Sequence, residues 1–76
     1  MRTITVATAE PGDVLYGCYP GHDKPLPELG EQIIIEVFSS WHRWRFHGRV
    51  IGLNHGTRTY VVKVGEMILE EEPDDA

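Results

Sequence analysis

Glycine and proline interrupt this chain so often that they limit what it can fold into. They recur at positions 11–12, 17, 20–21, 25, 27, 30, 48, 52, 56 and 65 of the 76-residue sequence. Both residues disfavour helix interiors, and strands fit the segments between these breaks better than amphipathic helices do. The punctuation therefore predicts an all-β fold.

A period of two in the hydrophobic pattern supports strands and assigns their faces. Residues 43–50 alternate a polar set at the odd positions with Trp44, Phe46, Gly48 and Val50 at the even positions. Residues 3–8, 14–17, 32–38 and 57–64 show similar alternation and are rich in β-branched side chains. The predicted core consists of the inward side chains: Ile4, Val6, Val14, Ile33, Ile35, Val37, Trp44, Phe46, Val50, Tyr60, Val62 and Val64.

The strongest local prediction is a hairpin between residues 43–50 and 57–64. Asn54-His55-Gly56 connects them, and we expect Gly56 to take the positive φ of a short loop with a bulge. A bend at Gly65 then leads to a short last strand at 66–69. The stretch 48–64 resembles the central hairpin of Tudor and KOW-type barrels. This resemblance covers under half of the chain, implies a five-stranded SH3-like barrel and transfers no functional residue; a twisted antiparallel sheet is the alternative.

Two segments lack periodicity. Residues 18–31 form a long proline-rich loop, which we expect to be tied down by Tyr16, Tyr19, Leu26 and Leu29. Residues 70–76 hold five acids and no base, and we expect a disordered acidic tail. The sequence thus predicts one domain, residues 1–69, followed by the tail at 70–76.

Composition excludes several classes of protein. Apolar residues at 41% and charged residues at 25% are ordinary for a folded domain. No run of apolar residues is long enough for a membrane span or a signal peptide, and Cys18 has no partner for an internal disulfide. We therefore expect a soluble cytoplasmic protein without membrane contact.

Charge is distributed unevenly along the chain. The formal net charge is -5, yet residues 41–64 hold five of the seven Lys and Arg residues and none of the 12 acids. Neighbours at i and i+2 share one face of a strand, so the odd positions of 43–49 form a row of cations. With Trp41 beside this row, the candidate binding residues are Trp41, Arg43, Arg45, His47, Arg49 and Arg58, joined by the aromatic side chains of Tyr16 and Tyr19.

These residues support competing hypotheses. The first is a non-enzymatic protein-binding module: an accessory subunit, an adaptor or a small inhibitor of the kind that phages and mobile elements encode. Arginine and aromatic side chains anchor such interfaces. The second is nucleic-acid binding by Arg43, Arg45, Arg49 and Arg58, which the acidic net charge opposes. In a variant of the first, the acidic tail imitates nucleic acid and engages a basic groove.

Catalysis ranks last. Ser39, Ser40 and His42 lie close together, but no nearby acid orients the histidine. Cys18 and the histidines lack the paired spacing of zinc ligands. We expect no cofactor, no metal and no enzyme activity, and the oligomeric state is open.

Overall fold

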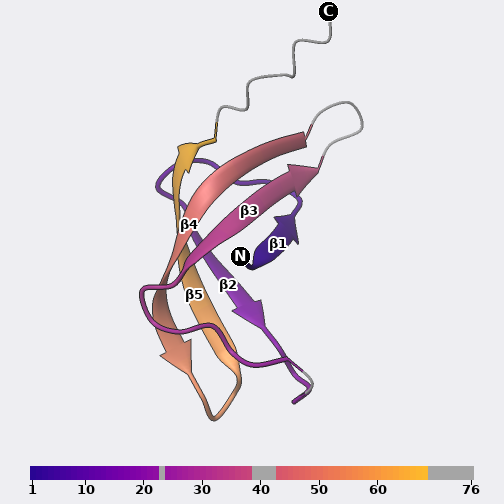
Figure 1. Ribbon diagram of the computed structural model, residues 1–76, viewed down its shortest axis with the longest axis vertical. Coiled ribbons are helices and arrows are strands. Elements are labelled where there is room, and N and C mark those ends of the chain that lie inside the picture. Colours follow the sequence, from indigo (N-terminus) through magenta and orange to yellow (C-terminus); the bar gives the residue numbers. More distant parts are fainter. Residues whose placement is uncertain (23, 39–42, 69–76) are drawn as a thin grey trace, which may run out of the picture.

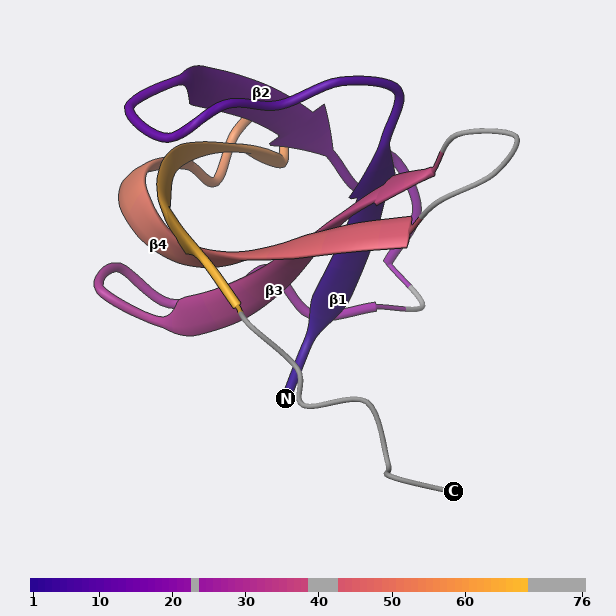
Figure 2. The ribbon, with the colours of Figure 1, turned by 90° about the horizontal axis from the view of Figure 1, so that it is seen from above.

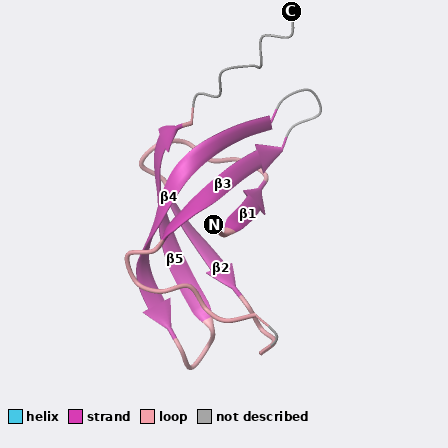
Figure 3. Ribbon diagram, in the orientation of Figure 1, coloured by secondary structure: helices cyan, strands magenta, loops and turns pink. Residues whose placement is uncertain are grey.

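The computed structural model describes residues 1–22, 24–38 and 43–68 (Figure 1). These ranges contain five strands and no helix (Figure 3). The strands are β1 (Thr3–Val6), β2 (Val14–Cys18), β3 (Gln32–Phe38), β4 (Arg43–Asn54) and β5 (Thr59–Met67). The predicted all-β class is confirmed. In the described part of the chain there is no helix long and apolar enough to cross a membrane.

The five strands form one sheet in the order β1-β3-β4-β5-β2. The sheet curls into a half-barrel, so that β2 lies across the interior from β3 (Figure 2). Strands β3, β4 and β5 form an antiparallel meander, and β2 is antiparallel to β5. This arrangement is consistent with the small SH3-like fold expected from the sequence.

One pairing differs from a wholly antiparallel sheet: β1 is parallel to β3. The chain that follows β1 crosses to the opposite edge of the sheet, forms β2 there and returns to begin β3. Strands β1 and β3 therefore start at the same end of the half-barrel and run in the same direction. The Ile34 N–H donates to the Arg2 carbonyl at 2.9 Å, immediately before β1 begins.

The core lies on the inner face of the curled sheet and contains most of the predicted residues. Ile4 and Val6 pack against this core while staying partly exposed. Two assignments were wrong. Val14 is 44% exposed because Leu15 points inward in its place. Trp44 is 38% exposed because it lies where β4 reaches the open end of the half-barrel. The buried residues are Ile33, Ile35, Val37, Phe46, Val50, Tyr60, Val62 and Val64.

The β4–β5 hairpin is confirmed, with a different turn. The loop holds residues 55–58, and its positive φ of 55° falls on Arg58, not on Gly56. The Asn54 side-chain oxygen accepts the Thr57 N–H at 3.1 Å, which closes the loop locally.

The strand is not interrupted at Gly65, where a bend was predicted. Strand β5 continues through Gly65 to Met67, which pairs with Phe46, and the Ile68 N–H donates to the Arg45 carbonyl at 2.8 Å. A separate strand at 66–69 is therefore wrong for residues 66–68. Residue 69 and the tail at 70–76 lie outside the described residues.

The long loop after β2 packs against one end of the half-barrel. Tyr19 and Leu26 pack on the core, as predicted, and Pro27 is buried as well. Tyr16 and Leu29 do not help, because they are 80% and 67% exposed.

Arg2 and Arg58 also hold this loop, by hydrogen bonds to its carbonyl groups. The Arg58 Nε donates to the Tyr19 carbonyl at 2.8 Å, and its terminal nitrogen donates to the Lys24 carbonyl. Arg2 donates to the Pro25 carbonyl at 3.0 Å and pairs with Glu31 at 3.1 Å. The Glu28 N–H donates to the Glu31 carboxylate, and this hydrogen bond, followed by the pairing with Arg2, lowers the pKa of Glu31.

Tyr60 makes stability depend on pH in the alkaline range. Its ring lies 5.2 Å from that of Tyr19, and burial raises the pKa of Tyr60 from 10.0 to about 12. The unfolded chain therefore loses this proton at lower pH than the folded chain, so we expect stability to fall as pH rises from about 10 to about 12. Urea midpoints measured across this range should fall more steeply for the wild type than for Tyr60→Phe. Parallel curves would contradict the assignment.

Candidate binding surface on the outer face of the sheet

The odd positions of β4 point away from the core, as the sequence predicts. Arg43, His47 and Arg49 are exposed and Arg45 is partly covered, whereas Phe46, Gly48 and Val50 are buried between them. The predicted row of cations therefore exists on the outer face of the sheet. Trp41, expected at its start, lies outside the described residues.

One carboxylate divides this row. Glu36 lies directly opposite Arg45 in the β3–β4 register. Its Oε1 is 3.9 Å from the Arg43 Nε, and its Oε2 is 3.9 Å from the Arg45 Nε. The Arg43 guanidinium also lies 5.1 Å from the centre of the Phe38 ring. The first two arginines thus have partners within the sheet. The sequence places Glu36 on the outer face but does not give the register that brings it to them.

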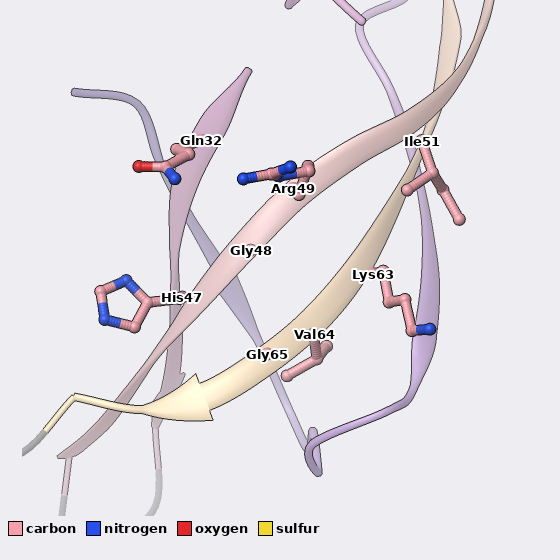
Figure 4. Close-up of a pocket in the computed structure, with 8 residues that line it drawn as sticks. All are labelled: Gln32, His47, Gly48, Arg49, Ile51, Lys63, Val64 and Gly65. Atoms are coloured by element: carbon pink, nitrogen blue, oxygen red, sulfur yellow. The ribbon is translucent and has the colours of Figure 1, made fainter. Parts of the chain in front are cut away.

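The second half of the row borders a shallow hollow of about 290 Å³. It lies beside the bulge between Phe46 and Gly48, where Gly65 passes under the His47 carbonyl without a side chain to fill the space. Figure 4 shows Gln32, His47 and Arg49 on one flank of the paired strands, and Ile51 and Lys63 on the other. No acid is among the lining residues, which are Gln32, His47, Gly48, Arg49, Ile51, Lys63, Val64 and Gly65.

Lys63 lines this hollow but is not among the binding residues predicted from the sequence. It lies directly opposite Arg49 in the β4–β5 register. A turn closing at 54–56 would have set Arg49 opposite Val61; the longer loop and the bulges move it to Lys63. Like charges directly opposite each other destabilise a sheet. Within residues 1–22, 24–38 and 43–68, neither Arg49 nor Lys63 forms an ion pair.

Apolar side chains continue this surface toward β2. Ile51 is 47% exposed, and Val14, directly opposite Lys63, is 44% exposed. Tyr16, the next outward residue of β2, is 80% exposed. We call this surface the basic–apolar patch, defined by Val14, Tyr16, His47, Arg49, Ile51 and Lys63.

The other predicted site residues lie elsewhere. Tyr19 packs on Tyr60 and accepts contacts from the Arg2 and Lys24 cations at 5.7 and 5.9 Å from its ring centre. Arg58 holds the loop after β2, as described above. The structure therefore gives both residues a structural role and does not bring them to the row.

The residues considered for catalysis are not tested by the fold. Ser39, Ser40 and His42 lie outside the described residues. Cys18 is exposed, with its Sγ 3.9 Å from the Thr57 carbonyl. No group of three or more metal-ligating side chains occurs among the residues that the structure describes.

A second hollow opens at the end of the half-barrel, with a volume of about 400 Å³. Residues 7–11 form one side, and Val37, Trp44, Phe46 and Met67 form the other. The half-exposed Trp44 and Met67 stand at its mouth. Its lining is apolar apart from Thr8 and Glu10, so the cations of the basic–apolar patch do not contribute to it.

Comparison with protein-family models, curated proteins and solved structures gives no match.

Proposed function

We propose that this chain is a non-enzymatic protein-binding module, an accessory subunit, adaptor or small inhibitor, that docks on an acidic segment of a partner protein. The opposed pair Arg49 and Lys63 carries the proposal. Two cations at one cross-strand position repel each other, and a carboxylate bound between them removes that repulsion.

The apolar members of the patch favour a protein partner. Tyr16, Val14 and Ile51 together expose a large aromatic ring and two branched aliphatic side chains beside the cations. Interface cores combine aromatic and arginine side chains in this way. Phosphate groups would use the cations and leave the aliphatic side chains without a partner.

Nucleic acid remains the second candidate, and two observations weaken it. Glu36 pairs with Arg43 and Arg45, which lowers the positive charge that half of the row offers to phosphates. The net charge of -5 opposes the long-range attraction on which phosphate binding depends.

A synthetic peptide in which glutamate alternates with valine tests the proposal. We expect it to bind the full chain at physiological salt, and the Arg49→Glu/Lys63→Glu variant to bind it at least about tenfold more weakly. Isothermal titration or fluorescence anisotropy measures both affinities.

The control is Arg43→Glu/Lys24→Glu, which changes the net charge equally at exposed positions outside the patch. It should bind within about threefold of the wild type. Equal losses in both variants would mean that only net charge matters. A single-stranded oligonucleotide that binds more tightly than the peptide would favour nucleic acid instead.

A further inference from the structure

Strand β2 is an end of the sheet with a free row of backbone groups. The Asp13 carbonyl accepts the Val64 N–H at 2.9 Å, and the Tyr19 N–H donates to the Arg58 carbonyl at 3.0 Å. Bonding alternates along a strand, so Leu15 and Gly17 between them also bond to β5.

It follows that the N–H and C=O groups of Val14, Tyr16 and Cys18 point away from β5. Among the described residues no strand lies beyond β2, and no hydrogen bond reaches these groups. Extended segments of other chains pair with free rows of this kind.

The β2 edge carries none of the usual protection against pairing. Its sequence, VLYGC, contains no charge and no proline. The outward side chains beside the free groups are the exposed Val14, Tyr16 and Cys18. An added strand would therefore meet apolar side chains on the same face as the basic–apolar patch.

The opposite edge, β1, differs in length and in charge. It has four residues, and its outward side chains are the small polar Thr3 and Thr5. Thr5 lies opposite Glu36, whose carboxylate already pairs with Arg43 and Arg45. Beside β2, Lys63 lies opposite Val14, and Arg49 lies opposite Lys63. Arg49 and Lys63 form no ion pair within the described residues, so an acidic segment is attracted to the β2 edge.

We propose that the acidic partner segment binds as an extended strand, added to the free edge of β2. This inference rests on the proposed function and specifies the bound conformation of the ligand. Neighbouring strands are spaced about 4.8 Å apart, so outward side chains of the added strand lie beside Val14 and Tyr16, within reach of the long Lys63 side chain. A carboxylate at that position lies in line, across the sheet, with Val14, Lys63 and Arg49. Its negative charge is opposite to that of the two cations.

Two N-methylated forms of the glutamate–valine peptide test strand addition without changing the protein. One form is methylated at every odd backbone nitrogen and the other at every even one. Only one set of N–H groups faces β2 in an added strand. We therefore expect one form to lose at least about tenfold in affinity, while the other binds nearly as well as the unmodified peptide. Amide exchange should slow at Val14, Tyr16 and Cys18 when the unmodified peptide binds.

A matched pair of variants tests the choice of edge. Tyr16→Glu places a carboxylate beside the β2 edge, and Thr5→Glu places one beside the β1 edge. Only Tyr16→Glu should weaken binding of the peptide. The reverse result, or protection of the amides of β1, overturns the assignment to β2.

The outcomes separate this inference from the proposed function. If both methylated forms bind as well as the parent peptide, strand addition is wrong and side-chain docking on the patch stands. If no form of the peptide binds, both proposals fail. If the free chain protects the same amides in a concentration-dependent manner, the β2 edge pairs with a second copy and the assignment to a partner segment is wrong.

Discussion

Phe46→Ala is expected to lower the free energy of unfolding by about 3–5 kcal/mol. The Phe46 side chain is 4% exposed and lies on the inner face of β4, opposite Ile35 of β3. It also lines the hollow at the end of the half-barrel, so its removal enlarges that space and takes away the contacts of the ring with the core. A loss of this size is a large share of the about 5–15 kcal/mol that stabilises a small domain. Urea denaturation followed by tryptophan fluorescence measures it.

Phe38→Ala is the matched control, because it removes the same side chain from the other face of the sheet. Phe38 is 54% exposed and contacts the Arg43 guanidinium. An exposed cation–π contact contributes about 0.5–1 kcal/mol, so this variant should lose no more than about 1 kcal/mol. Equal losses at Phe38 and Phe46 would mean that the faces of the sheet are reversed.

The faces of the long strands were predictable because their hydrophobic pattern has one solution. In β3 the inward positions are Ile33, Ile35 and Val37, and from Arg43 to Val50 of β4 every outward residue is an arginine or a histidine. A strand shifted by one residue would bury arginine and expose isoleucine, which no packing rearrangement offsets. All the predicted core residues of β3 and β5, with Phe46 and Val50 of β4, are therefore buried.

The short strand β2 was not predictable on the same basis. Val14 and Leu15 are adjacent apolar residues, so alternation does not say which one points inward. The inward face of β2 is set by Gly17, because the Tyr60 ring packs close to its backbone. Leu15, two residues earlier, lies on the same face and therefore points inward. That contact joins two distant segments, and a local pattern contains no signal for it.

The charge pattern on the outer face depended on register. The sequence shows that Arg43, Arg45, His47 and Arg49 share a face, and this is confirmed. It does not show that Glu36 faces the first two or that Lys63 faces Arg49, because loop length and bulges set both pairings. These pairings divide the predicted row into Arg43 and Arg45, which pair with Glu36, and His47 and Arg49, which belong to the basic–apolar patch.

Gly17→Ala is expected to destabilise the fold by about 3 kcal/mol, an unusually large effect for one methyl group. A Cβ at this position would lie 2.6 Å from Cε2 of Tyr60, and nearer still to Cζ and the hydroxyl oxygen. The Tyr60 ring is 5% exposed and packs on Tyr19, so it has no free space to enter. The substitution therefore separates β2 from β5 or expels a core tyrosine. Thermal unfolding and urea midpoints both report the loss.

The control is Gly52→Ala, at a strand glycine whose added Cβ meets only Val61, at an ordinary contact distance of 3.4 Å. It should be neutral or slightly stabilising, because alanine has less freedom to lose on folding. A double-mutant cycle identifies the cause: in a Tyr60→Leu background, which lacks the ring atoms in question, Gly17→Ala should cost less than in the wild type. An unchanged cost would show that Gly17 is required for its backbone and not for the space it leaves to Tyr60.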